Sequence, residues 1–335
     1  MVLAQHLDDQ AETLLLQLLR GAGVKGLGAM PVVRNQLPGI RDQPASLGPR
    51  ILRPLLEVSR SEIEDYARKN KLHWISDESN DDVCFDRNFL RHEIFPLLEK
   101  RFPAYRNTFL RASRHLAEAS GLLDELAAAD SKSCLVAGKL QIERLRKLTP
   151  PRARNLLRYT LAQQGVVPPS TVKLEEILRQ LLSSRTGAKL HIVFGDAEIR
   201  CFKGAVYLRP ASTAIETAWQ LAWHGEKQLT IADPAGIIGF TRRKGSGISL
   251  QKLAENPVTI RLRQGGERLR PDCKRPRRSL KNLLQEAALP PWERETLPLL
   301  FSGEHLVWVA GVGVDCDFQA AAGEPGLVVK WQLNR

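Results

Sequence analysis

The sequence predicts an α/β protein built from three successive regions. Residues 1–103 alternate short apolar runs with helical periodicity, a pattern typical of a parallel sheet covered by helices. Residues 131–211 combine two helical segments with three strands, and residues 212–335 are rich in strands with one short helix. These patterns predict a central domain of helices and strands and a small α+β domain, joined to the first region by a linker helix at 104–130.

The first region begins with a short apolar run and an amphipathic helix. The leucines of this helix recur at helical spacing and share one face: Leu14, Leu15, Leu18 and Leu19. Ser59 and Glu62 form an S-x-x-E capping box, which opens a second helix. In chain order the expected elements are a strand at 2–5, a helix at 8–21, a loop rich in Pro and Gly at 31–50, a strand at 50–58, a helix at 61–72 and a strand at 73–77.

The sheet expected in this region is short of strands. A doubly wound sheet needs several strands that are buried on both faces. Residues 1–103 offer only about three short ones, and the first begins next to Met1. Either another segment completes the sheet, or the chain lacks its beginning.

The later regions show clearer boundaries, because proline pairs precede two helices and short turns separate the strands. The expected helices lie at 104–129, 150–165, 170–184 and 279–287. The expected strands lie at 189–195, 197–203, 205–210, 228–233, 258–264, 297–302 and 305–314.

The charge of the chain indicates a polyanionic partner. Its 335 residues carry 49 Lys and Arg against 37 Asp and Glu, a net charge of +12. No apolar run approaches the ~18 residues of a membrane span, and acidic residues near Met1 are unlike a signal or transit peptide. We therefore expect a cytoplasmic protein that binds nucleic acid and no membrane.

The cysteines and histidines offer no obvious metal or disulfide pattern. The cysteines are odd in number and widely spaced: Cys84, Cys134, Cys201, Cys273 and Cys316. There is no C-x-x-C pair, and the seven histidines lack the spacing of metal ligands. The sequence thus predicts reduced thiols and no metal site.

The string G-A-G-V-K-G at residues 21–26 matches the G-x-G-x-x-G pattern of dinucleotide-binding loops. That pattern binds a pyrophosphate only when it follows a strand and opens a helix. Here it closes the leucine-rich helix. A helix stop followed by a turn is therefore the favoured interpretation.

Four polar residues gather at the start of that helix: His6, Asp8, Asp9 and Glu12. Asp9-x-x-Glu12 has the spacing of a capping box, and acids suit the positive end of a helix dipole. Against this, capping needs one acid, and these acids follow a strand at the edge where α/β sheets bind ligands. The residues alone leave a cap and a ligand site equally supported.

Two arginines four residues apart mark a further candidate site. Arg87 and Arg91 share one helix face, a pair suited to a carboxylate or phosphate. The alternative is salt bridges to nearby acids, which the residues alone favour: Asp82, Asp86 and Glu93.

A basic run lies in the last region. Seven of the fifteen residues 268–282 are basic, and Asp272 is the only acid among them. Two prolines keep the run extended until a helix begins near Ser279, where backbone N–H groups attract phosphate. We expect these side chains to bind a phosphate backbone: Arg268, Arg270, Lys274, Arg275, Arg277, Arg278 and Lys281.

Taken together, these segments resemble the tRNA(Ile)-lysidine synthetase family in its long bacterial form. Residues 6–30 look like the family's H-x-D-D-Q-x-E-T…L-x-R-G-x-G-x-x-G-L motif. The later blocks match in order: RPLLEVSRSEIEDYA, WISDESNDDVCFDRNFLR and RLRQGGERLRP…LKNLLQEAALPPWERETLPLLF. The resemblance spans nearly the whole chain, and Gln5, where many members have His, is a minor departure.

The resemblance implies a fold and a reaction. Residues 1–103 would be the C-terminal part of a Rossmann-like ATP-pyrophosphatase (PP-loop) domain, and the central (131–211) and C-terminal (212–335) domains would bind tRNA. The family uses ATP, with Mg²⁺ implied, to adenylate the wobble cytidine of a CAU anticodon. The ε-amine of L-lysine then displaces AMP to form lysidine, and a homodimer is a further expectation.

The resemblance also implies roles for the candidate residues. Asp9, Glu12 and Arg87 would be catalytic, with the two carboxylates meeting the lysine amine and Arg87 its carboxylate. His6, Asp8 and Arg91 would line the lysine and anticodon side, and either Arg87 or Arg91 could contact lysine. The basic run and the central domain would hold the tRNA acceptor stem and body, chiefly through shape and phosphates.

One departure from the family pattern is large. The family's S-G-G-x-D-S loop, which cradles the ATP phosphates, is absent from the chain; the nearest string is KGSGIS at 244–249. An arginine-bearing segment expected before residue 6 is also absent. We expect that about a hundred residues precede this sequence and that the chain alone is inactive. The alternatives are a non-catalytic tRNA-binding remnant, or another tRNA-modifying ATP pyrophosphatase of the thiolase type, which would bring paired cysteines.

Overall fold

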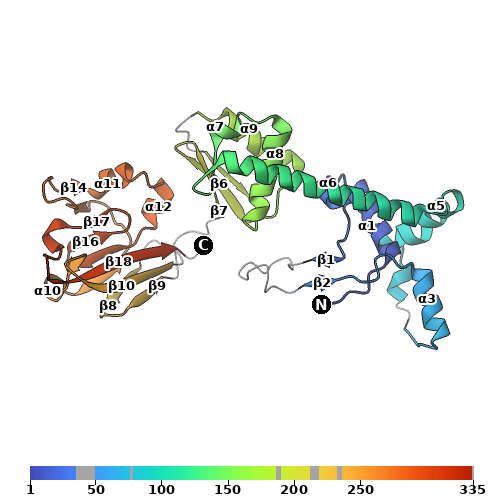
Figure 1. Ribbon diagram of the computed structural model, residues 1–335, viewed down its shortest axis with the longest axis horizontal. Coiled ribbons are helices and arrows are strands. Elements are labelled where there is room, and N and C mark those ends of the chain that lie inside the picture. Colours follow the sequence, from blue (N-terminus) through green and yellow to red (C-terminus); the bar gives the residue numbers. More distant parts are fainter. Residues whose placement is uncertain (35–49, 76–77, 186–189, 212–218, 232–235, 334–335) are drawn as a thin grey trace. The chain divides into compact units, whose positions relative to one another are not determined.

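The computed structural model describes residues 1–34, 50–75, 78–185, 190–211, 219–231 and 236–333. It divides into two compact units, Met1–Pro210 and Ala211–Arg335. The boundary lies next to residue 212, where the sequence places the start of the third region. Each unit is described by itself (Figure 1).

The first part of unit 1 is mostly helical. It contains α1 (Leu7–Leu19), α2 (Val24–Leu27), β1 (Val33–Arg34), β2 (Ile51–Leu52), α3 (Arg60–Lys69), η1 (Glu78–Asp81), α4 (Asp86–Phe89), a π-helical turn η2 (Leu90–Ile94) and α5 (Phe95–Arg101). β1 and β2 pair antiparallel, and Val2 forms a parallel bridge with Leu52. The capping box predicted at Ser59 and Glu62 is confirmed at the start of α3.

The strands of this part are shorter than predicted. The strand expected at 50–58 ends at Leu52, because Pro54 lacks a backbone N–H and the chain turns there. The segment expected at 2–5 forms only the single bridge, residues 73–75 form no strand, and residues 76–77 lie outside the described part. Within the described residues, a lone parallel bridge therefore remains of the predicted parallel sheet.

The glycine-rich segment is a structural turn, as predicted. Gly21 has φ +69°, the left-handed conformation that commonly follows a helix end, and α2 begins three residues later. Gly28 lies so close to α6 that a Cβ atom there would be 3.1 Å from the Cα of Ala117. The predicted leucine face is only partly correct, because Leu14 is buried whereas Leu18 and Leu19 are exposed.

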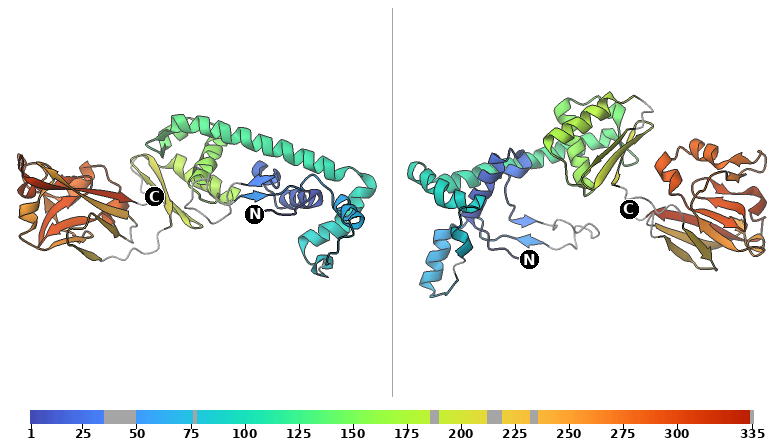
Figure 2. Two further views of the ribbon diagram at one scale, coloured as in Figure 1. Left: turned by 60° about the horizontal axis from the view of Figure 1, so that its bottom comes forward. Right: turned by 180° about the vertical axis from the view of Figure 1, so that it is seen from behind.

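The long helix α6 (Tyr105–Cys134) connects the two parts of unit 1. It packs against α1 and α2 near its start and against α8 further along, as two views show (Figure 1 and Figure 2). The linker helix predicted at 104–130 is therefore present and is also part of the packing around α1.

The central part is a sheet covered by helices. Its elements are β3 (Leu135–Val136), β4 (Lys139–Gln141), α7 (Ile142–Leu145), α8 (Pro150–Gln163), α9 (Thr171–Ser183), β5 (His191–Phe194), β6 (Ala197–Phe202) and β7 (Ala205–Pro210). The predicted three-strand run is confirmed as β5–β6–β7, and the full strand order is β3-β4-β7-β6-β5. A core of fully buried residues such as Leu156, Ile177 and Ile199 joins the helices to the sheet.

Unit 2 is a β-rich domain. Its elements are β8 (Gln220–Trp223), β9 (Gln228–Ile231), β10 (Gly236–Lys244), β11 (Ile248–Ser249), α10 (Leu250–Leu253), β12 (Val258–Arg261), β13 (Arg268–Leu269), β14 (Arg278–Ser279), α11 (Leu280–Glu286), α12 (Pro291–Glu295), β15 (Leu299–Ser302), β16 (His305–Val309), β17 (Gly313–Val314), η3 (Cys316–Phe318) and β18 (Pro325–Leu333). One sheet has the order β11-β18-β10-β9 and another β17-β16-β15-β12-β8, and both contribute to one core.

Sequence analysis missed the two longest strands of unit 2, β10 and β18. Neither strand shows a clear alternation of apolar and polar residues. β10 contains two glycines and a charged stretch, and β18 begins with Pro-Gly. Gly236 is required where β10 meets β18, because a Cβ there would lie 2.2 Å from the Trp331 ring. The tertiary contact, not local propensity, therefore selects this residue.

The prediction that all thiols are reduced is wrong for two of them. Cys273 and Cys316 form a disulfide although they are 43 residues apart in the sequence. Folding brings together two cysteines whose spacing gave no pattern. Cys84, Cys134 and Cys201 are free, and burial raises the pKa of the Cys201 thiol to about 11. Among the helices of the described residues, none is long and apolar enough to cross a membrane.

Candidate functional site

The start of α1 is held by a reciprocal contact between His6 and Asp9. His6 is the N-cap residue, and its backbone N–H donates to Asp9 Oδ2 at 2.9 Å. The predicted pairing of Asp9 with Glu12 as a capping box is therefore wrong, because the helix begins three residues earlier and Glu12 lies inside it. His6 Nε2 also lies 3.5 Å from Asp9 Oδ2.

Asp8 connects α1 to two other helices. Its carboxylate accepts hydrogen bonds from the Arg60 backbone N–H at 2.9 Å and from Arg106 Nε at 2.5 Å. Burial alone would raise the pKa of Asp8, but these two hydrogen bonds outweigh it and lower the pKa. Arg106 was not identified from the sequence, because it lies almost a hundred positions away on α6.

This lowered pKa predicts a loss of stability in acid. The unfolded chain takes up the Asp8 proton at higher pH than the folded chain does, so the stabilisation is complete above the unfolded pKa and lost as pH falls through the folded one. We expect Asp8→Asn to lower the free energy of unfolding at neutral pH. Below about pH 4, that free energy should fall less steeply in the variant than in wild type. Urea unfolding across a pH series measures this, and an unchanged pH slope would contradict it.

Glu12 and Arg91 form a buried ion pair between α1 and η2. The Glu12 side chain is 0% exposed, and its Oε1 accepts from Arg91 Nη2 at 2.8 Å and from Nε at 2.9 Å. Burial raises the pKa of Glu12 and Arg91 opposes that rise. Arg91 Nη2 also lies 3.9 Å from Asp9 Oδ1. The expectation that Glu12 faces lysine directly is at odds with this complete burial.

Arg87 is exposed and lies beside α1. Its Nη2 is 3.4 Å from Thr13 Oγ1, and it lines a cavity of about 690 Å³. Both arginines therefore contact side chains of α1, a contact that their spacing did not predict. Within the described residues, neither arginine pairs with the acids of the salt-bridge alternative, Asp82, Asp86 and Glu93. The cavity is lined by Thr13, Leu16, Gln17, Arg20, Ser79, Asn80, Cys84, Phe85, Asp86, Arg87 and Asn88.

The geometry separates two roles that the sequence could not distinguish. Glu12 is fully buried and paired with Arg91, whereas the Asp9 carboxylate is 14% exposed and Arg87 is exposed. Asp9 and Thr13 are four residues apart on α1, a rise of ~6 Å along the helix, and Arg87 lies beside Thr13. An anion and a cation at that spacing suit a ligand with opposite charges at its two ends.

The basic run of unit 2 folds as a hairpin in place of the predicted extended segment. β13 pairs with β14, and Cys273 in the intervening loop is bonded to Cys316. Asp315, which is 1% exposed, accepts from the Arg270 backbone N–H at 2.9 Å and from Arg277 Nη2 at 3.2 Å. The run is thus anchored by a buried carboxylate that is 38 to 45 residues away in the sequence.

Several of the predicted phosphate-binding arginines already have acidic partners. Arg270 and Arg277 pair with Asp317, and Arg278 pairs with Glu286. Asp317 could not be found from the sequence because it is 40 or more residues from these arginines, whereas Glu286 is only eight residues from Arg278. Lys274 and Lys281 are exposed and form no ion pair within the described residues, so they present their full charge to solvent.

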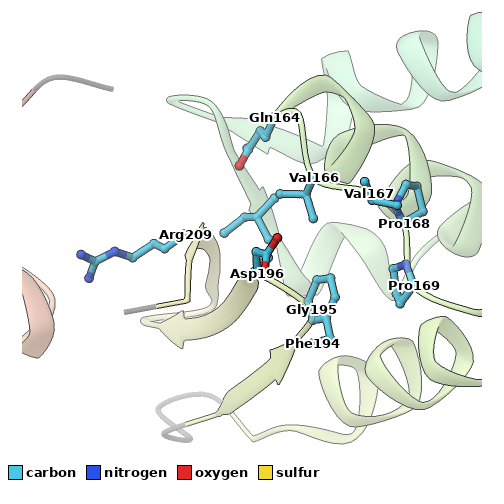
Figure 3. Close-up of a pocket in the computed structure, with 11 residues that line it drawn as sticks. Gln164, Val166, Val167, Pro168, Pro169, Phe194, Gly195, Asp196 and Arg209 are labelled. Carbon is cyan, nitrogen blue, oxygen red and sulfur yellow. The ribbon is translucent and has the colours of Figure 1, made fainter. Parts of the chain in front are cut away.

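A further cavity lies in the central part of unit 1, with a volume of about 300 Å³. Figure 3 shows Val166, Pro168 and Pro169 on its apolar walls, with Asp196 beside them and the Arg209 side chain extending away. The sequence showed no motif for this cavity, because its walls come from two loops and three strands, β5, β6 and β7. We assign it no role in the reaction.

Comparison with known proteins agrees with this division of the chain. Residues 1–98 match the family model of the PP-loop domain, residues 140–207 that of the TilS substrate binding domain and residues 258–331 that of the TilS substrate C-terminal domain. A tRNA(Ile)-lysidine synthase from Nitrosomonas europaea is 54% identical over 337 aligned positions, covering 100% of this chain and 72% of the relative.

The chain belongs to the tRNA(Ile)-lysidine synthase family. Family members from Aromatoleum aromaticum and Coxiella burnetii are 40% and 37% identical and cover 99% and 97% of this chain, and 75% and 70% of their own lengths. The resemblance seen in the sequence and the predicted α/β class are therefore confirmed. As a member of the lysidine synthase family, the chain is a ligase that uses ATP.

Proposed function

We propose that this protein ligates lysine to the wobble cytidine of tRNA(Ile) with a CAU anticodon, forming lysidine through an adenylated intermediate. The 54% identity to a tRNA(Ile)-lysidine synthase across the whole chain is the observation that carries this proposal. The net charge of +12 supports an RNA partner.

The lysine substrate has opposite charges at its ends, and α1 offers a partner for each. Asp9 meets the ε-ammonium group, and Arg87, beside Thr13 one turn further along, meets the α-carboxylate. Glu12 and Arg91 act through position: their buried pair fixes η2 against α1 and thereby places Arg87. His6 and Asp8 hold the first turn of α1 in place.

The ligation step requires a neutral amine. Asp9 accepts a proton from the lysine ε-ammonium group, and the freed nitrogen lone pair forms a bond to C2 of the adenylated cytidine. The bond from C2 to the adenylate oxygen breaks, and AMP leaves with its electron pair.

The ATP side of the reaction has no assigned residues in this chain. The S-G-G-x-D-S string is absent from its 335 residues, so we expect that the chain alone binds lysine and tRNA without adenylating the RNA. Within the described part of the chain, no group of His, Cys, Asp and Glu is placed to hold a metal ion. Mg²⁺ that binds together with ATP needs only one or two carboxylates besides the phosphates, so its use remains an expectation from the family.

Lysine binding and tRNA binding can be tested separately. We expect saturable binding of radiolabelled lysine in equilibrium dialysis. Norleucine, which lacks the ε-amine, and cadaverine, which lacks the α-carboxylate, should compete only weakly. Binding of tRNA without binding of lysine would favour a non-catalytic tRNA-binding remnant. Light scattering of the same sample tests the expected homodimer.

The tRNA-binding role of the basic run predicts unequal effects of its residues. We expect the Lys274→Glu/Lys281→Glu variant to bind tRNA about tenfold or more weakly, with a shallower salt dependence, because both lysines are exposed and have no ion-pair partner among the residues that the structure describes. Lys330→Glu, on β18 outside the run, is the matched control. Filter binding at several salt concentrations measures this, and equal losses in both variants would refute a specific role for the run.

The arginines of the run need a different test. Arg277→Glu would place a second negative charge beside buried Asp315, so a loss of tRNA binding there would mix misfolding with lost contact. The exposed lysines therefore give the cleaner test.

A further inference from the structure

Unit 2 contains a hollow of about 400 Å³ next to the basic run. It lies between the loop 264–267, the end of β12 and the turn that joins β15 to β16. This volume is within the range of small-ligand sites and is far too small for a nucleic-acid helix. A single nucleotide is the largest piece of RNA that it could enclose.

The floor of the hollow is a planar cation held on an aromatic ring. The guanidinium carbon of Arg261 lies 3.9 Å from the centroid of the Phe301 ring, and Phe301 is buried. The Arg261 side chain is 18% exposed, and its acidic neighbour Glu304, at 3.4 Å, is itself 90% exposed. A guanidinium plane held against a ring offers a surface on which unstacked RNA bases stack.

One wall of the hollow is a glycine turn that leaves space open. Gly265 and Gly266 have φ of +101° and +85°, and no atom lies within 4 Å of a Cβ position built at either residue. The Glu267 carboxylate holds this turn by accepting from the Gln264 and Gly265 N–H groups at 2.6 and 2.7 Å. The absence of side chains lets a ligand approach the backbone closely.

Another part of the wall is formed by two arginines, of which Arg277 is already paired with Asp315 and Asp317, so Arg268 supplies the positive charge. Arg268 and Arg277 both line the hollow, and Arg268 Nη2 donates to the Arg277 carbonyl oxygen at 3.1 Å. Arg268 is exposed and can turn its remaining donors toward a phosphate. A planar surface, an open turn and a cationic wall thus surround a space of nucleotide size.

We propose that this hollow binds one unpaired nucleotide of the RNA, with its base stacked on Arg261 and its phosphate beside Arg268. The proposal rests on the tRNA-binding role proposed for the basic run and adds that the domain holds single-stranded RNA as well as helix. Sequence-tolerant stacking of this kind is worth about 1–3 kcal/mol per base, which is about a five- to hundredfold change in affinity.

The test uses the full chain and two fluorescent probes, a short single-stranded oligoribonucleotide and a blunt-ended RNA duplex. Arg261→Lys keeps the charge and loses the planar surface, and Arg261→Gln loses both. We expect both variants to bind the single strand about five- to a hundredfold more weakly while their affinity for the duplex changes much less. Arg242→Lys, an exposed arginine on β10 outside the hollow, is the matched control.

The outcomes separate this proposal from the one on which it rests. If wild type binds the duplex but not the single strand, the nucleotide site is refuted and the tRNA-binding role stands. If wild type binds neither RNA, both are refuted. If Arg261→Lys binds the single strand as tightly as wild type does, the site is a simple charge contact. If free AMP binds at Arg261 as tightly as the single strand does, the site is one for a mononucleotide. Either result overturns the proposal.

Discussion

Replacing Arg91 with methionine is expected to lower the free energy of unfolding by about 3–5 kcal/mol, because it leaves a buried carboxylate without its partner. Glu12 is 0% exposed, and both of the hydrogen bonds to its Oε1 come from Arg91. Methionine retains much of the apolar volume of the side chain, so the loss measures mainly the charge. Urea unfolding at neutral pH, followed by circular dichroism, measures the effect.

Two further variants identify the cause of this loss. The double variant Arg91→Met/Glu12→Leu removes both charges and is expected to recover much of the stability, since a buried ion pair can be replaced by apolar residues at little cost. Arg20→Met disrupts the exposed pair of Arg20 with Asp86 and should cost about 1 kcal/mol or less. Equal losses in Arg20→Met and Arg91→Met would contradict a special role for the buried pair.

Replacing Asp9 with asparagine is expected to weaken lysine binding by about tenfold to a hundredfold, the range for losing a hydrogen bond to a charged group. The change removes the negative charge that we assign to the ε-ammonium group and keeps the size of the side chain. Equilibrium dialysis with radiolabelled lysine measures it. In a complete enzyme that also carries the ATP loop, the same change should raise the lysine KM or abolish ligation.

Two controls separate a loss of lysine contact at Asp9 from a general loss of charge or of folding. Asp86→Asn changes an exposed carboxylate that lines the cavity beside Arg87, and we expect a much smaller effect on lysine binding. Since Asp9 also accepts the His6 N–H, the melting temperature of each variant must be compared with wild type. Unchanged lysine affinity in a folded Asp9→Asn variant would remove Asp9 from the site.

The sequence predicted most helices because their signals are local. Ser59 and Glu62 predicted the start of α3, and the apolar periodicity after Ala104 predicted α6. Strands were harder to predict, because a strand depends on partners that are remote in the sequence. β10 and β18 define each other through nine paired positions, and neither carries a clear pattern of its own.

The sequence predicted the candidate site but not the contacts inside it. The H-x-D-D-Q-x-E-T segment and the arginine pair pointed to residues that the structure brings together around α1, and their role in the reaction stays a prediction. Which carboxylate is buried, and which arginine is neutralised, depends on contacts such as Arg91 with Glu12, 79 residues apart.

The sequence by itself determined the family, the positive charge, the helices and the residues available for chemistry, since these follow from composition and local spacing. Only the tertiary structure decided that Arg106 holds Asp8, that Cys273 meets Cys316, and that distant acids neutralise part of the basic run. The physical reason is the same in each case. Burial and charge pairing depend on which surfaces meet, and residues far apart in the chain meet only after folding.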